Sequence, residues 1–433
     1  MAQVVTARLA LANPSDWELW AARALLFLLL FKFPGYSFFP LSIILAAVLA
    51  ALGFLLSSLR MAPRLWTMVW LTVAAALNGW ALREFAGRTT MEIAPAQSAV
   101  SMVAWLSCFP LLVMLALWCF ERVDFIRGLA LVFLGALASI ALRADEWTWK
   151  GSLGIFATLF VLSIVGRMPA FVTRLVLLVA GATNIMADAR MMALFCAAVL
   201  ALTFLTPGQR RYFRDYPYRA AAVLVAAMSL FAIAAYEAMV RGWAGEQIQQ
   251  RTVNQVSRAG NVVLGGRTEW AASFSLFRDS PTGYGIAVIP DGRSIRAALN
   301  EVRKVGGDYS NEWYWYELVF GTRMDLHSNL VNMWAHFGIV GFVLAVWIGW
   351  HIFRALSVAV GVVGTWGAAP LFALLVGGWD LIFSPMGNAE RVVIALAVAV
   401  TMFALARVSM ERSTRSSHLL GSDNYGTPEP ASS

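Results

Sequence analysis

The stretch "MDLHSNLVNMWAHFGIVGF", Met324 to Phe342, passes from a polar segment into a helix apolar enough to enter a bilayer. It places His327 where that helix is expected to begin. An ionisable residue at the rim of a membrane helix is a functional candidate by default, and imidazole can exchange a proton near neutral pH. His327 is therefore the first candidate for chemistry. The alternative is an ordinary hydrogen-bonded histidine of the helix end.

The composition around this stretch is that of a polytopic membrane protein. Hydrophobic residues make up 60% of the chain and charged residues 13%, which lies outside the range of soluble domains. We predict an all-α integral membrane fold of about twelve transmembrane helices, the first of them retained rather than cleaved. The expected spans are 17–32, 38–58, 65–82, 98–119, 125–142, 151–166, 170–187, 191–206, 219–240, 327–350, 355–378 and 390–406.

Lysine and arginine concentrate beside alternate loops, which sets the expected orientation. Both termini are expected in the cytoplasm. The predicted parts are an N-terminal bundle of about nine helices (1–240), a helical extracytoplasmic loop resting on the membrane (241–326), three C-terminal helices (327–407) and a disordered cytoplasmic tail (408–433). The net charge of +8 is thus a topology signal, and we expect no nucleic-acid partner.

Two arginines are expected outside the membrane at positions suited to an anion. Arg190 lies in the tight turn of "NIMADARMMALF", and Arg267 follows paired glycines in "LGGRTEW". The planar guanidinium can hold a diphosphate through paired hydrogen bonds. The alternatives are a snorkelling arginine at a helix end for Arg190 and an ion pair with Glu269 for Arg267.

Other residues of the expected outer side are given structural roles. His336, nine positions after His327, falls on the opposite helix face and is interpreted mainly as a core histidine. Asp325 is expected to cap the helix or to orient His327. Trp313 to Tyr316 are expected to rest at the headgroup level. Neither the loop carboxylates nor the three cysteines have the spacing of a metal site.

The segment "HSNLVNMWAHFGIVGF" resembles the bacterial O-antigen ligase and O-antigen polymerase superfamily, in which a histidine precedes a glycine-apolar-apolar-glycine step. The upstream "GGRTEW" and "SPTGYGIAV" are similar to the same family's loop motifs. The resemblance covers roughly residues 180–345. This chain departs from the pattern at Ala189, Ser328 and His336, which leaves the acceptor and the reaction open.

The resemblance implies an inverting, metal-independent glycosyltransferase without a cofactor. It would move a glycan from a polyisoprenyl diphosphate, such as undecaprenyl diphosphate, to a hydroxyl of a polysaccharide or glycolipid acceptor on the outer side of the bilayer. His327 would be catalytic, and Arg190 and Arg267 would bind the diphosphate. Polymerase and ligase remain open. The alternatives are a transporter or flippase of lipid-linked sugars or small solutes, and a peptidoglycan-type polymerase that would not need His327.

Overall fold

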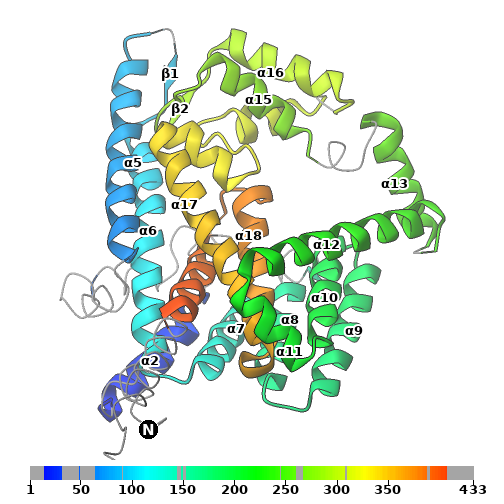
Figure 1. Cartoon of the computed structure of the whole chain (residues 1–433). Helices are drawn as coiled ribbons and strands as arrows, with labels where there is room; N and C mark the ends of the chain where they lie inside the picture. The colour runs from blue at the N-terminus through cyan, green and yellow to red at the C-terminus, as the bar shows by residue number, and fades with distance from the viewer. Residues whose placement is uncertain are drawn as a thin grey trace, which may run out of the picture.

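The chain is a bundle of helices in the computed structural model shown in Figure 1, which describes residues 14–31, 48, 64–89, 91–143, 148, 149, 153–243, 245–259, 267–307, 310–387 and 391–406. The helices are α2 (Asp16–Leu28), α5 (Arg64–Ala86), α6 (Ala96–Phe120), α7 (Phe125–Ala141), α8 (Gly154–Val165), α9 (Ala170–Met186), α10 (Arg190–Thr203), α11 (Pro207–Asp215), α12 (Pro217–Val240), α13 (Glu246–Ala259), α15 (Glu269–Asp279), α16 (Gly292–Lys304), the π-helix η3 (Trp313–Val319), α17 (Asn329–Trp366), α18 (Ala369–Phe383) and Arg391–Ala406.

Three of these helices are long and apolar enough to cross a membrane: Arg64–Ala86, Ala96–Phe120 and Asn329–Val360. Seven further apolar helices are 10–17 residues long. The helical, membrane-type fold is confirmed, whereas the number of twelve spans stays a prediction. The expected span 38–58, apart from residue 48, and the tail 408–433 lie outside the described residues.

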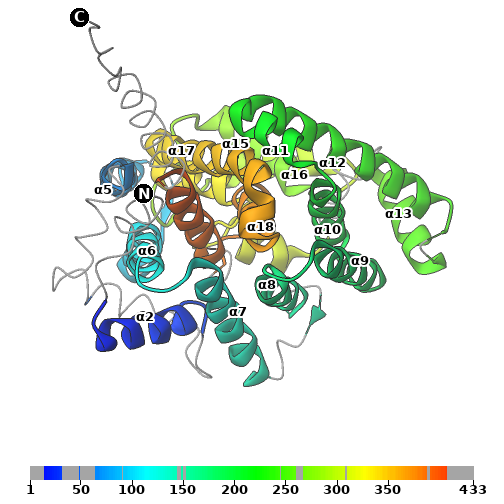
Figure 2. The same cartoon turned by 60° about the horizontal axis from the view of Figure 1, so that its bottom comes forward.

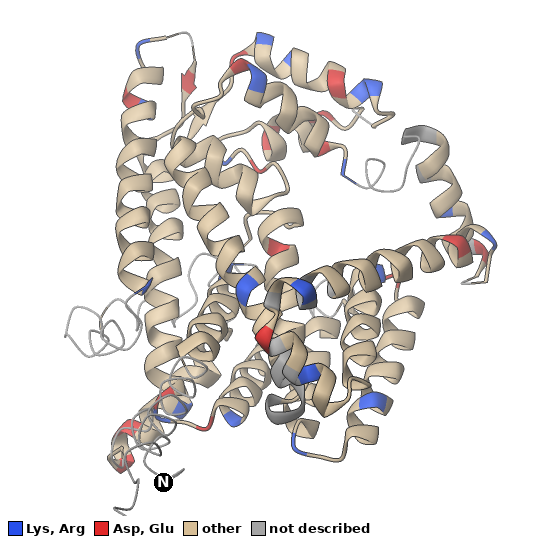
Figure 3. Ribbon diagram, in the orientation of Figure 1, with Lys and Arg blue, Asp and Glu red and all other residues tan. Residues whose placement is uncertain are grey.

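Charged residues are distributed as expected for such a bundle. Figure 3 shows acidic and basic residues on α15 and α16 at one end and around α2 at the other, with few along α5, α6 and the length of α17 between them. A side chain that must stay hydrated is costly in the middle of a bilayer. The long axis of this bundle is therefore the direction in which the helices would cross the membrane.

The predicted boundary between the spans 327–350 and 355–378 is wrong. Helix α17 continues from Asn329 to Trp366, past His351 and Arg354, and ends at Gly367, whose φ is +72°. Between residues 350 and 366 no proline interrupts the helix, and a lone arginine does not end one because its stem can snorkel. A glycine with positive φ is the usual stop signal at a helix C-terminus.

Gly338 breaks α17 locally. Its φ of +67° and ψ of −159° are not helical, and the carbonyls before it find partners outside their own helix. The carbonyl of Ala335 accepts from Tyr284 and Gly285, at 2.9 and 3.1 Å. The carbonyl of Phe337 accepts from the side-chain amide of Asn78 in α5, at 2.8 Å. The kink thus leaves no helix carbonyl unpaired at these positions, as a low-dielectric environment requires.

The loop of "SPTGYGIAV" lies between α5 and α17. Trp334 of α17 donates its indole N–H to the carbonyl of Pro281, at 2.9 Å, and the amide of Ile286 donates to Gly79 of α5, at 3.1 Å. A Cβ atom at Gly283 would lie 2.5 Å from the Trp334 carbonyl oxygen. Glycine at this position of the motif therefore allows the loop backbone to pack closely against α17.

Arg83 fastens the same loop to the end of α5. Its side chain is buried and donates to the carbonyls of Ile286, Ala287 and Ala94, at 3.0, 3.1 and 2.5 Å. Next to this clamp, β1 (Glu92–Ile93) pairs antiparallel with β2 (Val288–Ile289). This small sheet connects the turn between α5 and α6 to the segment 241–326, which the sequence had predicted as helical only.

The segment 241–326 contains α13, α15, β2, α16 and η3. Figure 1 shows α15 and α16 together at one end of the bundle, while α12 runs across the other helices toward α13. The expectation that Trp313 to Tyr316 all face the headgroups is wrong. Trp313 is 66% exposed and Tyr316 is 47% exposed, but Trp315 is buried in a second hydrophobic core and Tyr314 lies half-buried.

Candidate functional site

His327 precedes the first turn of α17 in a strained backbone conformation. The helix begins at Asn329, and its N-cap is Ser328, whose hydroxyl accepts from the amide of Val331. The φ of His327 is +53°, a left-handed value that costs a residue with a side chain about 1–2 kcal/mol. Strain of this kind gathers at functional sites and requires a surrounding structure that enforces it.

Asp325 holds His327 in this backbone conformation. One carboxylate oxygen accepts from the backbone amide of His327 and from the side-chain amide of Asn332, both at 3.0 Å. The other accepts from the backbone amide of Met386, at 3.0 Å. Asp325 thus ties His327 to α17 and to the turn after α18. Of its two predicted roles, helix capping is wrong, because Ser328 is the cap; it orients His327 through the backbone.

The imidazole of His327 is partly exposed and lies beside Tyr314 of η3. The two ring centroids are 5.8 Å apart, and Nδ1 of His327 lies 3.3 Å from the carbonyl oxygen of Asp325. A proton on Nδ1 would donate to that carbonyl, which leaves Nε2 with its lone pair. In this tautomer the imidazole can accept a proton from a substrate hydroxyl.

Tyr314 joins His327 to the segment that carries Arg267. Its hydroxyl donates to Glu269. Burial, the hydrogen bond to Glu269 and the negative charges of Glu269 and Asp325 all raise the pKa of Tyr314, and the positive charge of Arg267 opposes them. Tyr314 therefore stays protonated, and the charges of Arg267, Glu269 and Asp325 all act at its hydroxyl.

Glu269, which the sequence analysis names only as the alternative ion-pair partner of Arg267, has a buried side chain. One of its oxygens accepts from Tyr314, and the other is buried without a hydrogen-bond partner among the described residues. The available signal was its position two residues after Arg267, at the first turn of α15, where a carboxylate is favoured by the helix dipole.

Arg190 has a separate set of partners. It is the first residue of α10, and its Nε donates to Asp188 at 2.9 Å. Asp188 also accepts from Arg251 of α13. The second terminal nitrogen of Arg190, Nη2, is buried and has no hydrogen-bond partner within the described part of the chain. A positive side chain at a helix N-terminus opposes the dipole, which favours a role toward an anion.

A ladder of aromatic rings connects α10 to α15. Phe195 contacts Trp379 at 6.2 Å between centroids, Trp379 stacks on Phe383 at 4.1 Å, and Phe383 stacks on Trp270 at 5.4 Å. Arg190 precedes Phe195 by about 7.5 Å of helix rise. Arg190 thus lies less than two helical turns from the α10 end of the ladder.

The structure places His327 beside Tyr314, and it places Glu269, two residues after Arg267, at the Tyr314 hydroxyl. Arg190 precedes the ladder on α10, and within the described residues no contact joins it to His327. His336 is a buried core residue, as expected. Its Nε2 lies 2.8 and 3.1 Å from the carbonyls of Arg323 and Met324 and fixes the turn before His327.

These features define a helical, membrane-type protein with a polar site at one end of its bundle. Residues 175–346, which include all three predicted site residues, match the family model described as O-Antigen ligase. This match places that region of the chain in the O-antigen ligase and polymerase superfamily and confirms the resemblance. The family implies a bacterial membrane enzyme of glycosyltransferase type, with a lipid-linked glycan and a glycan acceptor as partners. No curated protein matches the chain.

Proposed function

We propose that the protein transfers a glycan from a polyisoprenyl diphosphate carrier to a hydroxyl of a polysaccharide or glycolipid acceptor, on the extracytoplasmic side of the bacterial cytoplasmic membrane. The observation that carries this proposal is the contact with Tyr314 of both His327 and Glu269, the latter two residues after Arg267, within the region that matches the family. A proton acceptor and a fixed positive charge in one site suit attack by a hydroxyl on a diphosphate-activated sugar.

His327 is the proposed proton acceptor. Its backbone is fixed by Asp325 and its Nδ1 faces the Asp325 carbonyl, so Nε2 would take the proton of the acceptor hydroxyl as the new bond forms between that oxygen and the anomeric carbon. The bond between the anomeric carbon and the diphosphate breaks at the same time. Attack from the face opposite the leaving group would invert the anomeric configuration.

Arg267 and Arg190 are the proposed ligands of the diphosphate. Negative charge grows on the leaving oxygen as the sugar departs, and prepositioned cations stabilise that charge without reorganising. Arg267 lies two residues before Glu269, which accepts from Tyr314, and Arg190 has a buried Nη2 without a partner in the described chain. The ladder from Phe195 to Trp270 would form the apolar floor between them.

The membrane arrangement is part of the same proposal. The site would face outward on the segment 241–326, between an N-terminal bundle within 1–240 and the helices of 327–407. A transporter would need its polar residues near the middle of the bilayer, whereas His327 precedes the first turn of α17 at one end of the bundle. This position favours an enzyme acting on substrates that lie at the membrane surface.

The test is release of the lipid diphosphate by purified protein in nanodiscs, supplied with a polyisoprenyl diphosphate oligosaccharide and several acceptors. His327→Asn is the better variant than His327→Ala, since asparagine tolerates the left-handed backbone. We expect wild type to release the carrier and the variant to lose at least 100-fold in rate, with donor binding retained. Binding without release by either protein would favour a lipid-sugar transporter, and an active His327→Asn variant would favour a polymerase based on a loop acid.

A further inference from the structure

A cavity of about 530 Å³ lies between α2, α7 and α8, far from the site of His327. Figure 2 shows these three helices side by side. Helix α6 separates the two places, because it begins at Ala96, next to β1, and ends at Phe120, where the chain turns toward the cavity. A helix of 25 residues is about 37 Å long, so cavity and candidate site lie at opposite ends of the bundle.

The two ends of the cavity differ in chemistry. Its charged lining residues are Arg23 of α2 and Arg122, Asp124 and Arg127 of the α6–α7 region. Its apolar lining residues are Leu19, Val123, Ala130, Leu131, Leu134 and Phe160. Leu134 lies about 10 Å further along α7 than Arg127 and is 40% exposed, so the apolar end opens to the surface of the bundle. The cavity therefore suits a molecule with an anionic head and an apolar tail.

The acids near the cavity already have partners. Glu18 accepts from Arg122 at 3.1 and 3.2 Å, and Arg122 lies over the ring of Trp118. Asp124 caps α7 and pairs with Arg167 at 2.5 Å.

Arg23 and Arg127 form no ion pair with any residue of the described chain. The guanidinium of Arg23 lies 5.6 Å from the ring of Trp20. The cavity thus keeps two positive side chains, on two different helices, without an ion-pair partner among the described residues, while Asp124, which also lines the cavity, pairs with Arg167. A phosphate group between them would receive charge-assisted hydrogen bonds.

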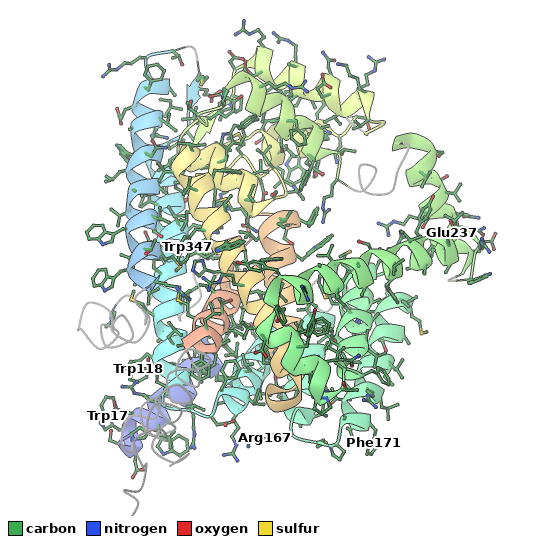
Figure 4. All side chains as sticks on the ribbon, viewed as in Figure 1. Trp17, Trp118, Arg167, Phe171, Glu237 and Trp347 are labelled. Atoms are coloured by element: carbon green, nitrogen blue, oxygen red, sulfur yellow. The ribbon has the colours of Figure 1, made fainter. Side chains whose placement is uncertain are left out.

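The charged end of the cavity has the residues of a membrane interface. Trp17 and Trp20 of α2 are 58% and 68% exposed, and Figure 4 shows Trp17, Trp118 and Arg167 at the same end of the molecule. Tryptophan and arginine gather at the level of lipid headgroups, and basic pockets between membrane helices bind anionic lipid heads.

We propose that this cavity binds an anionic glycerophospholipid, with its phosphate between Arg23 and Arg127 and one acyl chain along Leu131, Leu134 and Phe160. The lipid would bridge α2 to α7 in the leaflet opposite the candidate active site. It would act as a structural ligand that stabilises the packing of α2. This site is independent of the glycan-transfer proposal, because it uses none of the same residues or elements.

The experiment is a thermal-stability titration of the full-length protein, purified in a zwitterionic detergent and depleted of lipid. The probes are phosphatidylglycerol, phosphatidylcholine of the same chain length, inorganic phosphate and a polyisoprenyl phosphate. We expect only phosphatidylglycerol to raise the melting temperature with saturation. The double variant Arg23→Gln/Arg127→Gln should weaken its apparent affinity about tenfold or more. Ala130→Trp, which fills the cavity and keeps both charges, should weaken it as well.

The matched control is Arg219→Gln, which removes an arginine of α12 that does not line the cavity and lies instead over the ring of Tyr216. This variant should titrate like wild type. Equal shifts with phosphatidylcholine, or retention of the phosphatidylglycerol shift in both cavity variants, would refute the site. If inorganic phosphate alone raised the melting temperature as much as phosphatidylglycerol does, the cavity would be a site for small anions and not for a lipid. A larger rise with polyisoprenyl phosphate would overturn the choice of lipid.

Discussion

Tyr314 lies with its ring centroid 5.8 Å from that of His327 and donates its hydroxyl to Glu269. One tyrosine thereby fixes the position of the imidazole relative to α15, the helix that follows Arg267. The π-helix η3 makes this contact possible, because its wider turn buries Trp315 in the second core while Tyr314 faces the site. Helices of this kind are rare and are frequently found at functional sites.

Removing the hydroxyl of Tyr314 should impair transfer more than binding. We expect Tyr314→Phe to lower turnover about tenfold, because Glu269 is then left buried without that donor, at a cost of about 1–3 kcal/mol. The measurement is carrier release at saturating donor. Tyr316→Phe, at a neighbour that is 47% exposed, is the control and should match wild type. Equal activity of both variants would exclude Tyr314 from the site.

Arg190 should act chiefly on the donor. Loss of a charge-assisted contact costs about 1.5–3 kcal/mol, so Arg190→Gln should raise the KM for the lipid diphosphate roughly ten- to hundredfold. Arg251→Gln is the matched control, since Arg251 shares Asp188 with Arg190 but is mostly exposed. If Arg251→Gln raised the KM more than Arg190→Gln did, the main role of Asp188 would be to hold α13 in place. Arg190 would then lose its proposed role.

The packing of the 281–285 loop can be tested apart from catalysis. Gly283 has φ +94°, and an added Cβ would lie 2.5 Å from the Trp334 carbonyl oxygen and 2.8 Å from Gly338 Cα. Gly283→Ala should therefore destabilise the protein by about 1–2 kcal/mol from the backbone alone, and more from the clash. Thermal melting measures the loss. Gly292→Ala should melt like wild type, because the nearest atom is the flexible end of Arg296 at 3.4 Å.

Glu121, in the turn between α6 and α7, should make stability depend on pH. Burial raises the pKa of this carboxyl to about 7, although Arg122 at 3.6 Å opposes the shift. Between about pH 4.5 and 7 the folded protein keeps a proton that the unfolded chain loses, so stability should fall as pH rises through this window, by on the order of 2 kcal/mol. Melting temperatures of wild type and Glu121→Gln at pH 5 and 8 test this. If the melting temperature of the variant depended on pH as strongly as that of wild type, another titratable group would be the cause.

The sequence predicted the helices better than their ends. Apolar runs marked α6, α7, α9 and α10 closely, since burial of such runs leaves few alternatives. The length of α17 was missed because the spans were divided between residues 350 and 355, although "GTWGAAP" carries the better stop signal, Gly367 followed by Pro370. The kink at Gly338 could not be foreseen because it depends on Asn78 and Tyr284, far away in the sequence.

The candidate site was predictable in its residue types and less so in its connections. His327 stood out because a polar residue at the rim of an apolar helix is costly without a use. Tyr314 and Glu269 did not stand out, since exposed aromatics and carboxylates are common in such loops and only the folded η3 turns Tyr314 inward. The strain at His327 also depends on Asp325, whose carboxylate is fixed by the backbone amide of Met386, a contact that local sequence does not encode.

The contact between Gly283 and Gly338, with Gly79 next to it across the same interface, has an evolutionary consequence. A Cβ at Gly79 would lie 2.6 Å from the His336 carbonyl oxygen, and one at Gly338 would lie 2.3 Å from the Asn78 amide. A side chain gained at any of these positions would occupy space used by a neighbouring element of the same junction. Such positions should vary together among descendants of this chain, and a lineage that loses one of them must rebuild the whole junction between α5, α17 and the loop.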